Sequence, residues 1–334
     1  MNSIRTEFSK LDKSKWNYYE NENLKNPFSM EETHFDFIEK YFSKTGKLNE
    51  FPEDFKDMFD KKHLVGVEHT NSVFFLGSLL YSRLALDGKM GERLDERNFL
   101  FIWFLTSLAH DFGYKFENNF DLYKADINSF STLKAYFKIE YSILGQRLEE
   151  KNKVVKLYDQ IEKYFEYRLS KCRLDHGIIS GVVLFNSLLK HRRKIEKKDS
   201  VYNWEPSLEV DYASACLAIC MHNIWNINKE EQEKNDLDFS GIFPISFQEF
   251  PLLFLLGVID TIDPVKVFKC ESIEDVLNDI LINFSSQNEI ILKKRDGSNL
   301  NFQRLIDKAN GLTNWLAVKV CHSAHELKIE ILEI

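Results

Sequence analysis

With 334 residues, the chain is long enough for one large or two modest domains with a sizeable core. Its formal net charge of −8 argues against a protein that coats nucleic acid by bulk electrostatics, although a small nucleotide could bind where a metal neutralises its phosphates. Phenylalanine is abundant, with 28 residues, while glycine (13) and proline (6) are scarce, which favours helices.

Signals of secretion, membrane insertion and disulfide bonding are not expected in this chain. The first residues lack the apolar stretch of a signal peptide, and no apolar run reaches the ~18 residues of a spanning helix. The five cysteines are odd in number and lack C-x-x-C spacing. Cys216 and Cys220, one helical turn apart, are interpreted as core thiols rather than a metal pair. We therefore expect a cytoplasmic protein.

In chain order, residues 1–30 lack a clear period and are expected to form an irregular lead-in. Apolar spacing then predicts a series of helices over 30–43, 66–86, 96–110, 130–149, 152–168, 177–192, 208–223, 249–263 and 272–284. The polar stretches 197–206 and 226–241 are expected to be loops within one helical body, the second long enough to border a site.

The pattern changes near residue 285. A strand running into an Asp-Gly turn is predicted within 288–302, a short helix closed by glycine over 302–311, and paired strands over 316–320 and 326–332. The predicted fold is thus mainly α: a helical bundle over residues 1–285 with a small α+β appendage over 286–334.

Polar residues interrupt five apolar helices at one end or on a buried face. Asp111 is the least expected of them, because it follows the most apolar predicted helix, "FLFIWFLTSLA". At that end, a half-buried carboxylate faces the negative end of the helix dipole. Singly, each residue has a structural explanation: a histidine can be a hydrogen-bonded core residue, and Asp175 is best read as a helix N-cap. The remaining members of the set are His69, His110, His176, His222 and Asp260.

Taken together, these four histidines and two aspartates would leave several buried polar groups in need of partners. One or two divalent cations would satisfy them at once, because neutral imidazole and carboxylate are ligands that Mn, Fe, Ni, Co and Zn accept. A cation would also compensate the charge of Asp111 at the end of its helix. We therefore expect one or two divalent ions as cofactors, with Mg as a further candidate.

The order H…HD…H…H…D resembles that of the HD-domain superfamily of metal-dependent phosphohydrolases. "LAHDFGY" is similar to the "LLHDIG" signature of that family, and "DHGIISGVVLF" and "PLLFLLGVIDTID" resemble its later motifs, so the resemblance covers residues 60–265. It implies that the first metal is held by His69, His110, Asp111 and Asp260. It also implies a second metal held by His176 and His222, with Asp111 bridging the two ions.

The sequence departs from the family pattern at two places. Many members have a lysine three residues after the aspartate, where this chain has Tyr114, followed by Lys115. Lys115 is either a catalytic charge beside the substrate phosphate or a solvated lysine, and Tyr114 either orients a phosphate or packs. The second departure is His222–Asn223 in place of an adjacent histidine pair, with no G-Y-P motif after it, which argues against the cyclic-dinucleotide branch.

The expected function is metal-dependent hydrolysis of a phosphate ester or anhydride, with a small nucleotide or another phosphorylated molecule as substrate. The alternatives are an HD-type di-iron oxygenase and a catalytically silent nucleotide-sensing module with a structural metal. Neither a membrane nor duplex nucleic acid is expected as a partner, and the oligomeric state is left open. The basic run 190–198 is interpreted as a solvated helix terminus, too far along its helix to reach a phosphate bound near His176.

Overall fold

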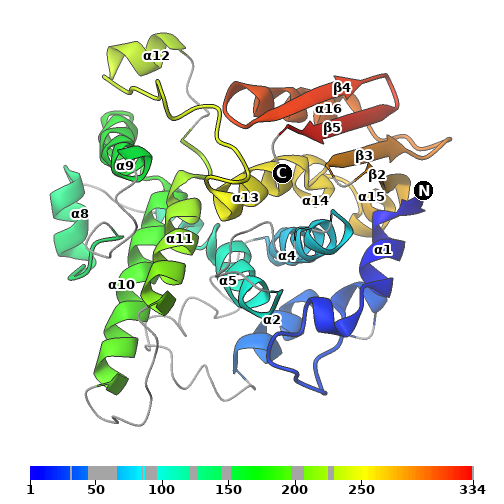
Figure 1. The fold of residues 1–334 in the computed structure, drawn as a ribbon, viewed down its shortest axis with the longest axis horizontal. Coiled ribbons are helices and arrows are strands. Elements are labelled where there is room, and N and C mark those ends of the chain that lie inside the picture. Colours follow the sequence, from blue (N-terminus) through cyan, green and yellow to red (C-terminus); the bar gives the residue numbers. More distant parts are fainter. Residues whose placement is uncertain are drawn as a thin grey trace. The chain divides into compact units, whose positions relative to one another are not determined.

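The computed structural model describes residues 1–30, 32–43, 66–84, 86, 96–119, 126–143, 152–196, 207–224, 229–286 and 288–332. These residues form a mainly α-helical fold with one small antiparallel sheet, as the sequence predicts (Figure 1). The chain divides into two compact units. The first unit comprises Met1–Thr45, Gly66–Ser107 and Phe243–Ile334, and the second comprises Gly46–Val65 and Leu108–Ile242. Within the described residues, no helix combines the length and apolarity needed to cross a bilayer.

Buried apolar helices form the centre of the first unit. Every residue of α4 from His69 to Tyr81 is buried, and the Trp103 indole of α5 lies against Gly77, where a Cβ would come within 2.1 Å of the ring. The helices of this unit are α1 (Ile4–Lys10), α2 (His34–Ser43), α4 (Val67–Arg83), α5 (Glu96–Ala109, whose last two residues enter the second unit), α13 (Pro251–Ile262), α14 (Pro264–Val267), α15 (Ile273–Asp279) and α16 (Gln303–Asn310).

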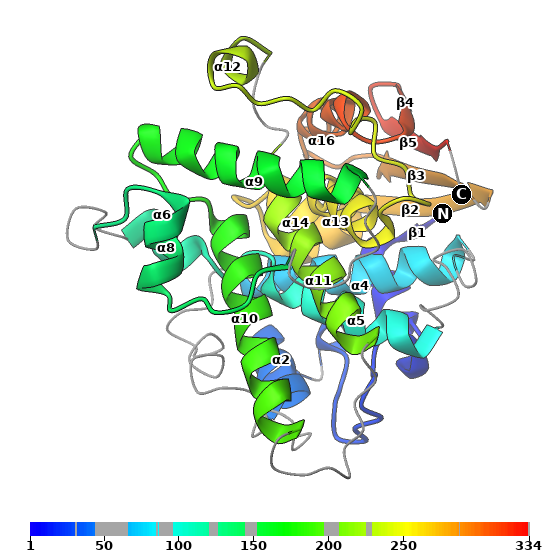
Figure 2. The ribbon, with the colours of Figure 1, turned by 60° about the vertical axis from the view of Figure 1, so that its left-hand side comes forward.

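The sheet of the first unit joins the two ends of the described chain. Its strands are β1 (Asn2–Ser3), β2 (Ile280–Ser286), β3 (Glu289–Lys294), β4 (Val318–His322) and β5 (Glu326–Ile331), in the order β1-β2-β3-β5-β4. Every neighbouring pair is antiparallel. The turn after β3 contains Gly297 at φ +82°, which suits the predicted Asp-Gly turn. Helix α16 packs against β4 (Figures 1 and 2).

The second unit is built around the helices α10 and α11, which pack along each other (Figure 2). Glycines on α10 permit the close approach: a Cβ on Gly181 would lie 2.4 Å from the sulfur of Cys220. Cys216 and Cys220 are fully buried, which confirms them as core thiols, and burial raises the pKa of both. The helices of this unit are α6 (Tyr114–Asn119), α8 (Phe130–Tyr136), α9 (Asn152–Ser170), α10 (His176–Glu196), α11 (Ser207–Met221) and α12 (Lys229–Lys234).

The structure corrects several predicted elements. Residues 1–30 are not an irregular lead-in, because they contain β1, α1 and two 3₁₀ turns, Lys13–Lys15 and Pro27–Ser29. The helix predicted over 272–284 ends at Asp279. The residues from Ile280 onward form β2, because they pair with the neighbouring strands β1 and β3. The helix predicted over 130–149 ends at Tyr136, and residues 144–149 lie outside the described residues. The division of the chain at residue 285 stays a prediction.

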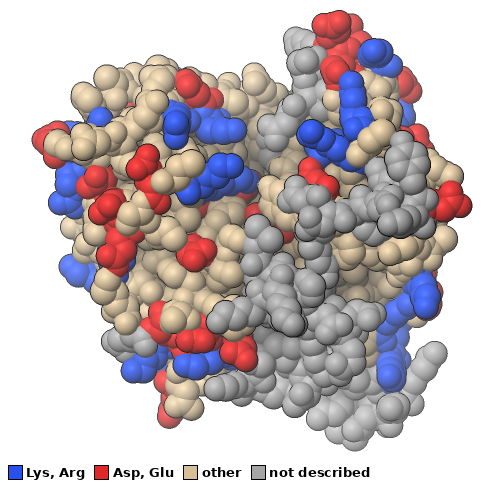
Figure 3. Space-filling model, turned by 180° about the vertical axis from the view of Figure 1, so that it is seen from behind, with Lys and Arg blue, Asp and Glu red and all other residues tan. Residues whose placement is uncertain are grey.

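One of the two predicted loops and the basic run also differ from expectation. The stretch 226–241 contains the short helix α12, while the loop 197–206 lies outside the described residues. The end of α10 is not simply solvated, because Arg192 is 5% exposed and forms an ion pair with Glu209 of α11, as does Arg193. Over the face drawn in Figure 3, basic and acidic side chains of the described residues are interspersed.

Candidate metal centre

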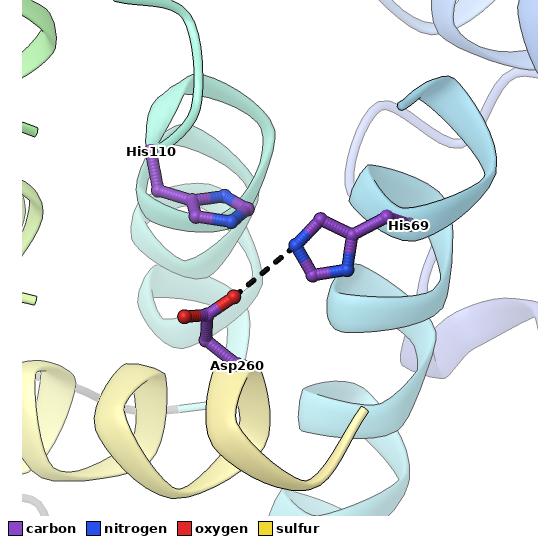
Figure 4. Close-up of side chains that lie close together, drawn as sticks. All are labelled: His69, His110 and Asp260. Atoms are coloured by element: carbon purple, nitrogen blue, oxygen red, sulfur yellow. Dashed lines mark ion pairs between the residues drawn. The ribbon is translucent and has the colours of Figure 1, made fainter. Parts of the chain in front are cut away.

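The first candidate group lies where α4 begins and α13 ends. His69 is in the first turn of α4 and Asp260 in the last turn of α13, and both side chains are buried. Their ring Nε2 and carboxylate Oδ1 are 3.1 Å apart (Figure 4). A histidine and an aspartate from two apolar helices thus face each other inside the first unit.

A second carboxylate, Asp263, fixes the ring of His69. Asp263 is fully buried and caps α14, accepting hydrogen bonds from His69 Nδ1 at 2.6 Å, from the hydroxyl of Ser72, and from the backbone N–H of Lys266 at 3.1 Å. Because a carboxylate only accepts, Nδ1 must carry the proton of the His69 ring. The lone pair of a neutral His69 ring is therefore at Nε2, which faces Asp260. Many metal-binding histidines likewise donate their other ring N–H to a carboxylate.

The ammonium group of Lys266 occupies the outer side of the same carboxylate. Its Nζ lies 2.7 Å from each oxygen of Asp260, and its side chain is 35% exposed, against 6% for Asp260. The stretch from Asp260 to Lys266 thus supplies a candidate ligand, the residue that orients His69, and a positive charge.

The second candidate group is delivered by a tight turn after α5. His110 and Asp111 lie in this turn, which is closed by a hydrogen bond from Phe112 N to Ala109 O at 3.2 Å. Gly113 follows, and its N–H donates at 2.7 Å to Ser180 on α10. A Cβ on Gly113 would lie 2.2 Å from the carbonyl oxygen of His176, so only glycine allows the turn to contact the start of α10.

Three histidine rings of the second unit surround the carboxylate of Asp111. Its Oδ1 lies 3.3 Å from Nε2 of His110, 3.4 Å from Nε2 of His176 and 3.8 Å from Nε2 of His222. The rings of His176 and His222 are both buried and lie side by side, with centroids 5.2 Å apart. The packing of α10 against α11 brings them together, since His176 begins one helix and His222 follows the other.

The rings of His176 and His222 are also held from behind. His222 Nδ1 donates to the carbonyl oxygen of Ile219 at 2.6 Å, and His176 Nδ1 donates to the carboxylate of Glu117, which Arg168 also contacts. Burial alone would lower the pKa of His176, but hydrogen bonds to Asp111 and Glu117 outweigh it and raise the pKa to about 9. The site therefore favours a positive charge between these carboxylates.

Asn223 lies against the same two rings. Its amide nitrogen is 2.7 Å from His176 Nε2 and 3.0 Å from His222 Nε2. An amide has donors at one end and an acceptor at the other, so Asn223 can serve these rings whether or not they carry a proton at Nε2.

The structure locates the remaining predicted residues as follows. Asp175 accepts a hydrogen bond from Ile178 N at 2.9 Å, which confirms it as a helix cap. The Tyr114 ring stacks on His176 with centroids 3.7 Å apart, and both roles considered for it stay predictions. Lys115 lies in α6, but its side chain is outside the described residues.

Three functional candidates were not identified from the sequence: Glu117, Asp263 and Lys266. Asp263 carried a detectable signal, because an aspartate directly before Pro264 is typical of a helix N-cap. Glu117 carried none, since its approach to His176 depends on how the Gly113 turn places α6.

No family model, curated protein or solved structure matches this chain. The chemistry of the site follows from its donor atoms. Within each unit, one group has ligand atoms within 4.8 Å of one another and could contribute to a metal site: His69 and Asp260 in the first unit, and Asp111, His176 and His222 in the second. His110, adjacent to Asp111 in the chain, also lies beside the second group. Imidazole nitrogen and carboxylate oxygen suit Mn, Fe, Co, Ni and Zn.

Proposed function

We propose that this chain is a metal-dependent phosphohydrolase of the HD-domain superfamily, acting on a phosphate ester or anhydride of a nucleotide. One observation carries the proposal: His69, His176 and His222 each turn Nε2 toward an aspartate carboxylate, Asp260 for His69 and Asp111 for the other two, while Nδ1 is held by an acceptor. The order of the ligands along the chain, which resembles that of the superfamily, supports it.

The tautomers explain why a cation suits these groups. A neutral ring that donates through Nδ1 has a lone pair at Nε2, and a carboxylate also presents lone pairs. Two acceptors that face each other at 3.1–3.4 Å, as His69 and Asp260 or His176 and Asp111 do, need a proton or a cation between them. A divalent ion would satisfy the histidine nitrogens and the aspartate oxygens together.

The residues of the chain would divide the work between binding and orientation. Asp111 and Asp260 would supply charge, the four histidines neutral nitrogen ligands, and Asp263 and Glu117 would hold two rings in place. When bound, a divalent ion lowers the pKa of water and polarises phosphoryl oxygens, which is the chemistry that phosphate hydrolysis requires.

The test combines metal analysis with a nucleotide panel. Purified protein is analysed for bound metal, then assayed with cyclic nucleotides and nucleoside mono-, di- and triphosphates in the presence of Mn, Mg, Co or Ni. Asp111→Asn is the test variant. Asp159→Asn, which alters an exposed aspartate on α9, is the matched control.

We expect one or two ions per chain and phosphate release from at least one nucleotide. Asp111→Asn should lose metal and activity, together with the stabilisation that metal binding gives, about 2.7 kcal/mol at a metal concentration of 100 Kd. Asp159→Asn should behave as wild type. Absence of bound metal under every condition would refute the proposal, and dioxygen-dependent turnover with bound iron would favour the oxygenase alternative.

A further inference from the structure

Lys266 is held at both ends beside the first candidate group. Its backbone N–H donates to Asp263, and its ammonium lies 2.7 Å from both carboxylate oxygens of Asp260. It therefore neutralises the carboxylate that also faces the buried His69. Its side chain, at 35% exposed, is the most accessible of this set.

An ammonium group and a divalent ion compete for the same carboxylate. Both are attracted to the Asp260 oxygens, and a metal ion needs a lone pair of at least one of them. Two cations so close to each other repel, most strongly where water is scarce. Binding of a metal by His69 and Asp260 should therefore displace the flexible lysine side chain from at least one oxygen, toward its exposed side.

A displaced ammonium group at this point has a natural partner in a phosphate. A phosphate that approaches the ion brings negative oxygens next to the lysine, and lysine binds phosphate well as a point charge. Lys266 would then pair with Asp260 in the metal-free site and with the phosphate in the metal-loaded site.

We propose that Lys266 neutralises Asp260 until a metal binds, and then binds the phosphate group of the substrate. This proposal rests on the proposed function, because it assumes a metal at the first group. It predicts opposite effects of removing the lysine: metal alone binds more tightly, whereas phosphate binds the metal-loaded protein more weakly.

The test compares Lys266→Met with Lys269→Met by isothermal titration. Lys269 is an exposed lysine one turn further along, so its replacement makes the same change in net charge. Chelator-stripped protein is titrated with Mn alone, and Mn-loaded protein is titrated with inorganic phosphate. Thermal unfolding of each variant reports whether it folds.

We expect Lys266→Met to bind one Mn roughly tenfold more tightly than wild type, by analogy with the effect of a close like charge on a titration. Its metal-free form should unfold at a lower temperature, because Asp260 loses its ammonium partner. Phosphate affinity of the Mn-loaded variant should fall about tenfold or more, and Lys266→Arg, which keeps the charge, should restore it. Lys269→Met should match wild type in all three measurements.

Two results would overturn the proposal in different ways. If wild type binds Mn and Lys266→Met has the affinities of Lys269→Met, the role of the lysine is refuted and the proposed function stands. If wild type binds no Mn, the metal centre itself is refuted and this proposal falls with it.

Discussion

At the scale of single residues, the candidate centre depends on acceptors placed behind its histidines. Asp263 stands behind His69 and Glu117 stands behind His176, so two rings have a carboxylate at Nδ1. Burial alone would raise the pKa of Glu117, but the hydrogen bond and charge of His176, and then Arg168, outweigh it and lower the pKa. Glu117 is thus an anion that fixes the ring and raises its basicity.

Replacing Glu117 should weaken metal binding without unfolding the second unit. Glu117→Gln keeps an oxygen that can accept from Nδ1 but removes the charge, and we expect the Mn affinity to fall by about 10- to 100-fold. Glu166→Gln, an exposed position on α9, should leave the affinity unchanged. Titration with Mn, and the absorption spectrum of the Co-loaded protein, would measure both effects. Equal affinities in the two variants would mean that Glu117 only supports the helix packing.

The candidate ligands at the ends of apolar helices could be selected from the sequence alone, because a charged residue directly after an apolar run such as "FLFIWFLTSLA" needs a partner. It did not predict the residues behind them. Glu117 lies on the short helix α6 among polar neighbours, and its role appears only once Gly113 has brought this segment against α10.

At the scale of elements, the packing of α10 on α11 sets the distance between two candidate ligands. A Cβ on Gly177 would lie 2.8 Å from the His222 ring and 2.8 Å from the carbonyl oxygen of Ile219, which also accepts from that ring. The glycine therefore permits His222 to lie beside His176.

Gly177→Ala should separate the two helices locally and disturb the second group. We expect about 1–3 kcal/mol of destabilisation from overpacking, with loss of one bound Mn. Gly311→Ala is the control, because a Cβ there meets nothing within 4 Å and the backbone has a helical φ of −63°. The control should be neutral or stabilising by about 0.4–1 kcal/mol. Thermal unfolding and metal analysis test both; unchanged Mn content in folded Gly177→Ala would contradict the model.

The far end of the same helix pair is held by an ion triad. Glu209 accepts from Arg193 at 3.0 Å and also pairs with the buried Arg192. Burial alone would raise the pKa of Glu209, but the two arginines outweigh it and lower the pKa below its usual 4.5. Its contribution to stability is therefore present above pH 4.5 and is lost as the pH falls through the lowered value.

Glu209→Gln should destabilise the protein at pH 7 by roughly 3–5 kcal/mol, because it removes the carboxylate charge that pairs with the buried Arg192 and with Arg193. The gap between variant and wild type should shrink as the pH falls below 4.5, where wild type also loses the carboxylate charge. Chemical unfolding across this pH range measures it, with Glu166→Gln as the exposed control. A gap that is independent of pH would show that packing, not charge, accounts for the effect.

In the segment 272–284, the local spacing of apolar residues does not distinguish a helix from a strand. Val276, Leu277 and Ile280 have helical spacing, while Ile280 and Ile282 are buried on alternate positions of a strand. The apolar residues of this segment fit both a helical and a strand repeat. The pairing of β2 with β1 and β3 determines that the residues from Ile280 onward form a strand. Likewise, Asn2–Ser3 is too short to be recognised as a strand without its partner.

At the scale of the whole molecule, the sheet-bearing part of the first unit contacts the helix that carries Asp260. Trp315 is 1% exposed, and its ring lies against Gly257 of α13, where a Cβ would come within 2.1 Å. Backbone hydrogen bonds of 2.8 Å join Ile245 to Trp315 and Ala317. These contacts connect Trp315 and Ala317 with the segment before α13 and with the middle of that helix.

Trp315→Ala should leave a cavity beside α13 and destabilise the protein by about 3–5 kcal/mol. Because Asp260 lies one turn beyond Gly257, we also expect weaker binding of one Mn. Leu332→Ala, at an exposed position just beyond β5, should change neither property. Thermal unfolding with and without Mn would separate the two effects. Wild-type Mn affinity in the folded variant would show that α13 keeps its position without the tryptophan.

The first unit has a further consequence for the order in which the chain acquires its structure during synthesis. Asn2 pairs with Ile282, so the N-terminal residues leave the ribosome long before their partner strand exists. At about 5–20 residues per second, the wait is on the order of half a minute. The second unit lies wholly within residues 46–242 and can fold in the meantime. We therefore expect nascent chains that stop before residue 243 to protect the second unit from protease while the first stays open to cleavage.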